Sequence, residues 1–233
     1  MAVSGLNRQD RIVKFLSTSV GRDRLNRFLQ YFARFLVWHL QRTSASKDAV
    51  TRAAALMTVI AQTRKIMQTG RQLEFYQAGM KALTLSDPIL KATTVLKCIF
   101  MSAWLSYDTC QWIHTIGLNK FDSIKDINTN AFKCWLFALV FSLVGDLYKL
   151  KINTRKIEVE KRNASAGKGE ESKKNVKSLN EERGKLWIAT VQDAVDLVLP
   201  LSGLEYIQVE SGIVGLAGAF TSLLGGYSHW ASL

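Results

Sequence analysis

Apolar side chains recur at steps of three and four along most of the first 81 residues. Residues 8–20 and 22–42 are each predicted to be a helix, with Gly21 between them, and the spacing is clearest in the second stretch. The second stretch also has a polar face, opposite the apolar one: Arg27, Gln30, Arg34 and Gln41. We therefore expect two amphipathic helices, followed by a short loop over residues 43–46.

Residues 48–81 predict a third helix, in which residues 62–74 form the most amphipathic part. One face is formed by Val59, Thr63, Ile66, Gly70 and Leu73. The opposite face is formed by Arg64, Lys65, Gln68, Arg71 and Gln72. A basic amphipathic helix of this kind fits a membrane interface, and it also fits a helix bundle with a solvated basic face.

The middle of the chain predicts a helical hairpin with a membrane segment. Asp87 and Pro88 are typical of a helix start, and the helix leads into an aromatic-rich stretch at 98–119. Residues 134–145 are uncharged and rise about 18 Å as a helix, short of a hydrocarbon core of roughly 30 Å. Extended to 131–149, the segment reaches about 28 Å if its terminal lysines extend to the headgroups.

The last third of the chain changes character twice. Residues 151–185 are highly charged and contain glycine, serine and asparagine, so we expect a linker with frayed helix at its ends. A helix over 186–199 should stop near Pro200. Residues 211–233 carry no formal charge with neutral histidine, and as a helix they cover about 34 Å, enough to cross a bilayer.

These elements predict an all-α membrane protein with amphipathic N-terminal helices. It has two transmembrane helices, or three if residues 98–119 also cross. The predicted regions are a basic amphipathic cytosolic region, a helical hairpin, a charged linker and a C-terminal helical hairpin with a transmembrane helix: 1–87, 88–150, 151–185 and 186–233.

Composition and charge narrow the choice of partner. Of 233 residues, 48% are hydrophobic, which excludes a fully disordered chain. Only two residues are proline, and this scarcity of turn residues argues against a β-sandwich or β-barrel. The net charge is +12. Residues 1–81 hold 14 basic against 4 acidic side chains, whereas residues 186–233 hold 4 acidic and no lysine or arginine. An anionic surface is the expected partner, either lipid or nucleic acid, although we find no nucleic-acid reader module.

Small residues recur at every fourth position in the closing helix. Two such rows are present: Ser211, Gly215 and Ala219, and Gly218, Ser222 and Gly226. Small residues at this spacing let helix backbones approach closely, which drives association inside lipid. They would serve a buried hairpin of a soluble protein equally well.

Two acidic residues lie in or beside apolar stretches, and they are the candidates for a polar path. Asp108 and Asp146 would either line such a path through the membrane or sit at the interface as caps. The three cysteines and three histidines show no metal-ligand spacing, and no catalytic constellation is present. We therefore expect no enzyme activity, no metal and no cofactor.

Four segments, spread in order over nearly the whole chain, resemble one protein family. They are residues 11–24 running into 29–36, the basic stretch with Thr63-Arg-Lys65 and Gly70-Arg71, residues 134–147, and residues 216–225. The chain resembles the peroxin-eleven family of peroxisomal membrane elongation and proliferation factors. It departs from that family's denser basic stretch at Gln68 and Gln72, which are neutral.

This resemblance implies a multi-pass peroxisomal membrane protein, with both ends in the cytosol, that self-associates and bends the bilayer before peroxisome fission. It implies acidic phospholipid and the fission machinery as partners, and no nucleic acid. It places Arg64, Lys65 and Arg71 against headgroups, and it inserts Ile66, Met67 and Leu73, with Val59 of the apolar face, into the leaflet. The alternative it carries is a pore for small metabolites.

Overall fold

The computed structural model describes residues 7–165 and 169–233, and within these ranges the chain forms helices and no strand. The helices are α1 (Arg8–Ser17), α2 (Ser19–Arg42), α3 (Lys47–Gln68), α4 (Gln72–Ala82), α5 (Pro88–Thr115), α6 (Ile124–Ser165), α7 (Gly169–Asp196), α8 (Val198–Gly203) and α9 (Ser211–Ser232). The all-α fold class is confirmed.

The first two helices meet at Thr18, three residues before the expected break. The Thr18 hydroxyl accepts a hydrogen bond from the backbone N–H of Gly21 at 2.9 Å and so caps α2. Gly21 lies inside α2, where an added Cβ would stand 2.0 Å from the carbonyl oxygen of Phe15. Gly21 is therefore needed for the close approach of the two helices and does not end one.

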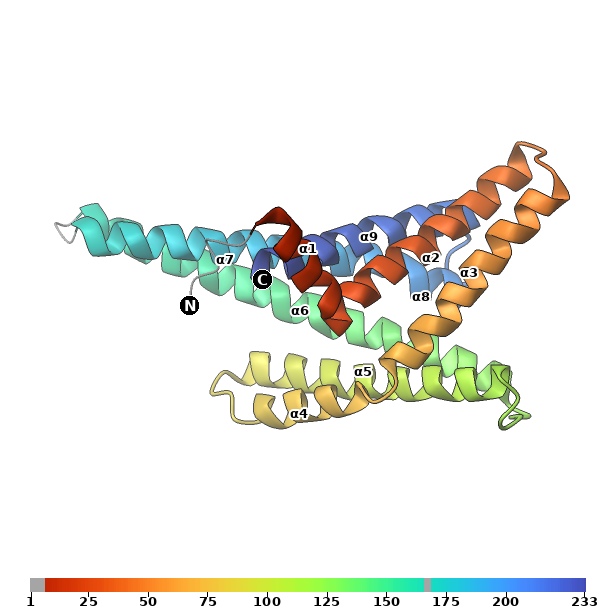
Figure 1. The fold of residues 1–233 in the computed structure, drawn as a ribbon. Coiled ribbons are helices and arrows are strands. Elements are labelled where there is room, and N and C mark those ends of the chain that lie inside the picture. The colour runs from red at the N-terminus through yellow and green to blue at the C-terminus, as the bar shows by residue number, and fades with distance from the viewer. Residues whose placement is uncertain (1–6, 166–168) are drawn as a thin grey trace.

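The expected helix over 48–81 is two helices. α3 ends at Gln68, and Gly70 adopts φ +91, a backbone conformation that glycine reaches without strain, before α4 begins at Gln72. The amphipathic stretch 62–74 is therefore bent at Gly70, and its last residues belong to a helix of different direction (Figure 1).

Two helices among the described residues are long and apolar enough to cross a membrane. They are α5, and α6 over Ile124–Ala164. The expected span 131–149 lies within α6, whereas the second candidate is α5, which contains most of the 98–119 stretch. The closing helix α9, which was expected to cross the membrane, is not among these candidates.

The charged segment 151–185 is helical over its described residues, instead of an open linker. α6 continues to Ser165 and α7 starts at Gly169, and the two helices pack together as a long arm (Figure 1). Residues 166–168 lie outside the described residues. Glutamate, lysine and arginine are strong helix formers. Packing of α6 against α7 then stabilises both helices more than the sequence of either helix would alone.

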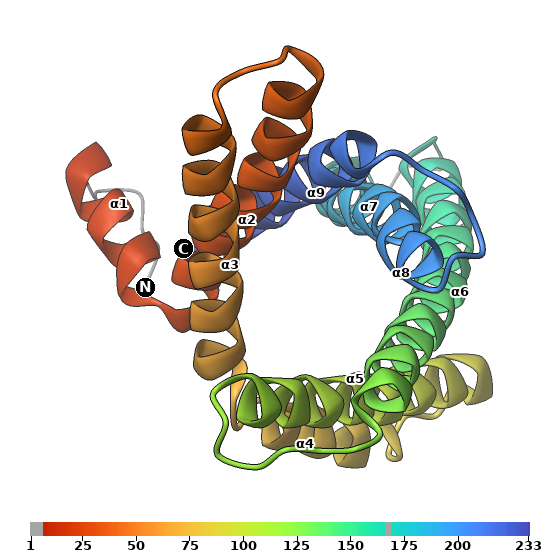
Figure 2. The ribbon, with the colours of Figure 1, turned by 90° about the vertical axis from the view of Figure 1, so that its right-hand side faces the viewer.

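The helices surround a common centre when viewed end-on. Figure 2 shows α2 with α9, α7 with α8, α6, and α5 with α4 arranged as a ring that α3 closes. α2 packs along both α3 and α9, so the N-terminal region and the C-terminal hairpin form one body. α1 lies against the end of α9, where Lys14 Nζ donates to the carbonyl oxygen of Leu233 at 2.9 Å.

Many large apolar side chains of this ring are exposed. The main buried cluster is small, with Tyr31, Leu199, Val214 and Ala219 at its centre. Large apolar side chains are exposed on α1, α2, α3, α4, α5, α6 and α9. On α9 they form one continuous stripe: Ile213, Leu216, Phe220, Leu223 and Tyr227. Such extensive apolar exposure marks a surface that is covered by lipid or by a partner.

Candidate functional site

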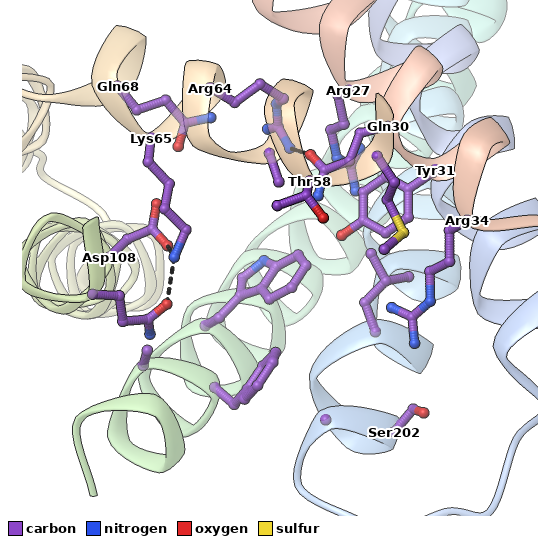
Figure 3. A pocket seen from close by; sticks show the side chains of 18 of the residues that line it. Arg27, Gln30, Tyr31, Arg34, Thr58, Arg64, Lys65, Gln68, Asp108 and Ser202 are labelled. Atoms are coloured by element: carbon purple, nitrogen blue, oxygen red, sulfur yellow. Dashed lines mark hydrogen bonds and ion pairs between the residues drawn. The ribbon is translucent and has the colours of Figure 1, made fainter. Parts of the chain in front are cut away.

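A cavity of about 570 Å³ lies inside the ring, between α2, α3, α5, α6 and α8 (Figure 3). Its charged and amide lining residues are Arg27, Gln30, Arg34, Arg64, Lys65, Gln68, Asp108 and Gln111. Its larger apolar lining residues are Val37, Met57, Trp104, Phe132, Trp135 and Leu199. The polar faces of α2 and α3 therefore point inward, while their apolar faces point outward.

The inward face of α3 is tied to α2 by Asp23. Arg64 Nε lies 3.0 Å from Asp23 Oδ1, and Gln68 Nε2 donates to the same oxygen at 2.9 Å. Arg64 Nη1 also donates to Gln30 Oε1 at 2.8 Å. Burial raises the pKa of Asp23, but the Arg64 guanidinium and the Gln68 amide outweigh burial, so the pKa is lowered from 3.8. Asp23 is thus a fixed carboxylate.

The neighbouring lysine of α3 reaches α5, the next helix of the ring. Lys65 Nζ lies 3.0 Å from Asp108 Oδ1 on α5 and also donates to Gln111 Oε1 (Figure 3). Asp108 therefore lines the cavity, and its negative charge is balanced by the ammonium group of Lys65. Asp146 does not line it: this residue is buried on α6, where its Oδ1 lies 2.9 Å from Lys149 Nζ. The two acidic residues proposed for a polar path are not brought together.

A second group of buried charges joins α2 to α7 and α9. Arg27 Nη2 lies 2.6 Å from Asp196 Oδ1, which also accepts a hydrogen bond from the Thr221 hydroxyl at 2.6 Å. The Arg27 guanidinium carbon stands 5.3 Å from the centre of the Tyr31 ring. Two turns after Arg27 on α2, Arg34 Nε donates to the Ser211 hydroxyl at 3.0 Å.

The residues expected to enter the leaflet lie mostly on the outer surface. Val59 is 63% exposed, Ile66 52% and Leu73 68%. Met67 is half-buried, and its sulfur accepts a hydrogen bond from Asn26 Nδ2 at 3.4 Å. Past Gly70 the outer apolar stripe continues on α4, through Leu73, Tyr76, Met80 and Leu83.

The residues expected to contact headgroups are divided between the inside and the outside of the ring. Arg64 and Lys65 point into the cavity, and their side chains are 13% and 19% exposed. Arg71 lies at the bend, with Nε 3.5 Å from Glu74 Oε2. In this conformation Arg64 and Lys65 bind carboxylates of the same chain, and lipid contact by either residue would require its ion pair to open.

The small residues of α9 pack against α2 within the same chain. An added Cβ at Gly215 would lie 2.6 Å from the backbone nitrogen of Phe35, and one at Gly218 would lie 2.3 Å from the Tyr31 ring. Ala219 and Ser222 are buried too, and Ser211 contacts Arg34. The small residues of α9 therefore have a packing partner, α2, inside the same chain. Their role in self-association stays a prediction.

The sequence alone gave no role to Arg27, Arg34, Asp196 or Thr221. Arg27 and Arg34 belong to the polar face of residues 22–42, so a signal was present, but an amphipathic pattern does not tell whether its polar face meets water or an enclosed cavity. Asp196 is 169 residues away from Arg27, and no local pattern pairs them.

The family model of peroxisomal biogenesis factor 11 (PEX11) matches residues 9–230 of the chain. Among curated proteins, the chain is 30% identical over 228 residues to peroxisomal membrane protein PMP27 of Saccharomyces cerevisiae and 28% identical over 226 residues to peroxisomal biogenesis factor 11 of Schizosaccharomyces pombe. Each alignment covers 94% of this chain and 93% of the relative. Human peroxisomal membrane protein 11A is 24% identical, with 93% and 94% covered.

No solved structure matches the chain. The relatives are named as peroxisomal membrane proteins and as a biogenesis factor, not as enzymes, and α5 and α6 fit a membrane-embedded protein. With a family match over nearly its whole length, the chain belongs to the PEX11 family of peroxisomal membrane proteins that take part in peroxisome biogenesis.

Proposed function

We propose that the chain bends the peroxisomal bilayer and so drives elongation, proliferation and fission of the organelle. The observation that carries this proposal is the apolar stripe on the outer face of α3 and α4. Leu56, Val59 and Ile66 are exposed on α3, and the stripe continues on α4. These side chains would be solvated by acyl chains, while the opposite face of α3 is held by ion pairs to α2 and α5.

A stripe of this kind bends a membrane when it enters one leaflet only, because it widens that leaflet relative to the other. The α5–α6 hairpin would hold the chain in the bilayer, and two crossings place both chain ends on one side, which we assign to the cytosol. Acidic phospholipid would be attracted by the basic first third of the chain, where Arg71 beside the stripe is the best-placed headgroup contact. Self-association and fission-machinery recruitment belong to the same proposal.

The proposal is tested by tubulation of acidic liposomes that contain the full chain. Val59→Asn together with Ile66→Asn should reduce tubulation several-fold, because each substitution removes about 1.5–3 kcal/mol of apolar burial in the leaflet. Val159→Asn is the matched control, since Val159 is 55% exposed on the charged arm of α6, away from the apolar segment. Equal tubulation by the outer-stripe variant and the control would contradict the proposal.

A pore for small metabolites is the second candidate function, and the cavity favours it. Asp108 lines the cavity and Asp146 does not, so Asp146→Asn is the matched control for Asp108→Asn. Asp108→Asn leaves Lys65 without its carboxylate and should shift the ion selectivity of planar-bilayer conductance toward anions, whereas Asp146→Asn should leave selectivity unchanged. The same ion selectivity in both variants would show that the cavity is not the conducting path.

A further inference from the structure

The cationic side chains that line the cavity outnumber the carboxylates that pair with them. Arg64 pairs with Asp23, Lys65 with Asp108, and one terminal nitrogen of Arg27 with Asp196. Arg34 has no carboxylate partner among the described residues, and its Nε donates instead to the neutral hydroxyl of Ser211. One cationic side chain that lines the cavity is therefore left without a counter-charge.

A second group in the cavity wall is also unsatisfied. Arg27 is only 5% exposed, and its Nη1 has no hydrogen-bond partner among the described residues. Arg27 and Arg34 are two turns apart on one face of α2, with Tyr31 between them (Figure 3). Guanidinium groups bind phosphate and carboxylate oxygens through directed N–H···O bonds. An oxyanion would supply the missing acceptor and the missing charge together.

The opposite wall of the cavity has the chemistry of an apolar pocket. Trp104 of α5 and Trp135 of α6 stack with ring centres 5.3 Å apart, and Phe132 and Leu199 also line the wall. The volume of about 570 Å³ falls in the range of small-molecule sites, about 300–1,000 Å³. A cationic wall facing an aromatic wall fits a ligand with an anionic head and an apolar body.

We propose that this cavity binds an amphiphilic oxyanion, with its phosphate or carboxylate head at Arg27 and Arg34 and its apolar part against Trp104 and Trp135. Two sources share this chemistry: the headgroup region of an acidic lipid from the surrounding membrane, and a soluble amphiphilic anion. The binding site does not depend on bilayer bending, which uses the outer surface of α3 and α4.

The test uses the full chain in phosphatidylcholine nanodiscs and equilibrium dialysis of radiolabelled hexyl phosphate, with empty discs as the blank. The wild-type chain should bind hexyl phosphate saturably, and more tightly than inorganic phosphate or hexanol. Arg34→Gln should raise the Kd about tenfold or more, and Arg34→Lys should restore part of the affinity. Arg22→Gln, an exposed arginine of the same helix, is the matched control and should leave the Kd unchanged.

A second variant blocks the cavity without touching an arginine. Ser202→Trp on α8 should fill the space beside Arg34 and abolish hexyl phosphate binding, which keeps the test valid if Arg34→Gln does not fold. Discs of phosphatidylcholine and phosphatidic acid, nine to one, separate the two sources: competition with hexyl phosphate assigns the site to a lipid headgroup, and unchanged binding assigns it to a soluble anion.

Three results would overturn the inference. The first is a Kd for hexyl phosphate that both Arg34→Gln and Ser202→Trp leave within twofold of wild type. The second is equal binding of inorganic phosphate, which would remove the apolar half of the site. The third is equal binding of hexanol, which would remove the anionic half.

Discussion

The Asp23 carboxylate links two helices through side chains that lie 41 and 45 residues away along the chain. Its Oδ1 accepts hydrogen bonds from Arg64 and from Gln68, and the three side chains are largely buried. The neutral Gln68, which departs from a denser basic stretch, is thus a hydrogen-bond donor inside the molecule. Removing one member of such a buried pair leaves the partner charge without compensation.

Asp23→Asn should therefore lower the free energy of unfolding at neutral pH by about 2–3 kcal/mol. The folded-state pKa of Asp23 lies below its ordinary value of 3.8, so the stabilisation is complete above pH 3.8 and is lost as the pH falls through the folded-state value. The difference between variant and wild type should shrink over that acidic range. Thermal unfolding in detergent, followed by circular dichroism, measures both effects.

Asp48→Asn is the control for this prediction, because Asp48 and Arg52 form a pair whose side chains are 69% and 80% exposed. Its effect should stay below about 0.5 kcal/mol. An Asp23→Asn variant as stable as this control would show that the α2–α3 contact does not depend on the ion pair.

At the scale of elements, the glycines of α9 explain how this helix is held against α2. Gly212, Gly215 and Gly218 bring α9 so close to α2 that added Cβ atoms would overlap Trp38, the Phe35 backbone and Tyr31. The other face of α9 keeps its large apolar side chains outside. Close backbone packing on one side and lipid-like side chains on the other are both properties of helices inside membranes.

Gly215→Ala should destabilise the fold by about 1–2 kcal/mol, because its Cβ would meet the α2 backbone, which cannot move aside, and the helix-propensity gain only partly offsets this. Gly226→Ala is the matched control: its Cβ would meet Arg24 Cβ at 4.0 Å, an ordinary contact, so stability should be unchanged or higher. Detergent-solubilised unfolding midpoints of the two variants test the packing. Equal midpoints would contradict it.

The sequence predicted those elements whose signals are local. Asp87 caps α5, with Oδ1 accepting from the backbone N–H groups of Ile89 and Leu90, as the Asp87-Pro88 pair indicated. The break at Gly70 was missed because a single glycine inside an amphipathic pattern is tolerated in a helix as readily as it ends one. The arm formed by α6 and α7 was missed because its stability comes from pairing, which composition does not show.

The candidate site was predictable only in part, for the same reason. Basic amphipathic periodicity identified the two faces of α3 correctly, and the exposed apolar one is where the pattern puts it. The partners Asp23 and Asp108 are on other helices, so the sequence could not indicate that Arg64 and Lys65 face an enclosed space. A polar face has the same periodicity whether it meets headgroups, water or a cavity.

At the scale of the whole molecule, α2 and α3 turn polar side chains toward the cavity, and the outer faces of α3, α4 and α9 are apolar. The buried ion pairs of α2 with α3 and with α7, and that of α3 with α5, surround the cavity, whereas the outer faces of α3, α4 and α9 are apolar. In water this arrangement would expose a large apolar area and bury charges. In a bilayer the outer faces would be solvated by lipid, and the inner charges would be satisfied by one another.

The most direct test of this account is the accessibility of spin labels on the full chain in liposomes to dissolved oxygen, which concentrates in lipid, and to a water-soluble nickel complex. Labels at Val59, Ile66 and Phe220, on the outer faces of α3 and α9, should collide mainly with oxygen. Labels at Thr58 and Ser202, which line the cavity, should show much lower oxygen accessibility, and a label at Val159 on the charged arm should collide mainly with nickel. Nickel accessibility at the outer positions equal to that at Val159 would contradict the account.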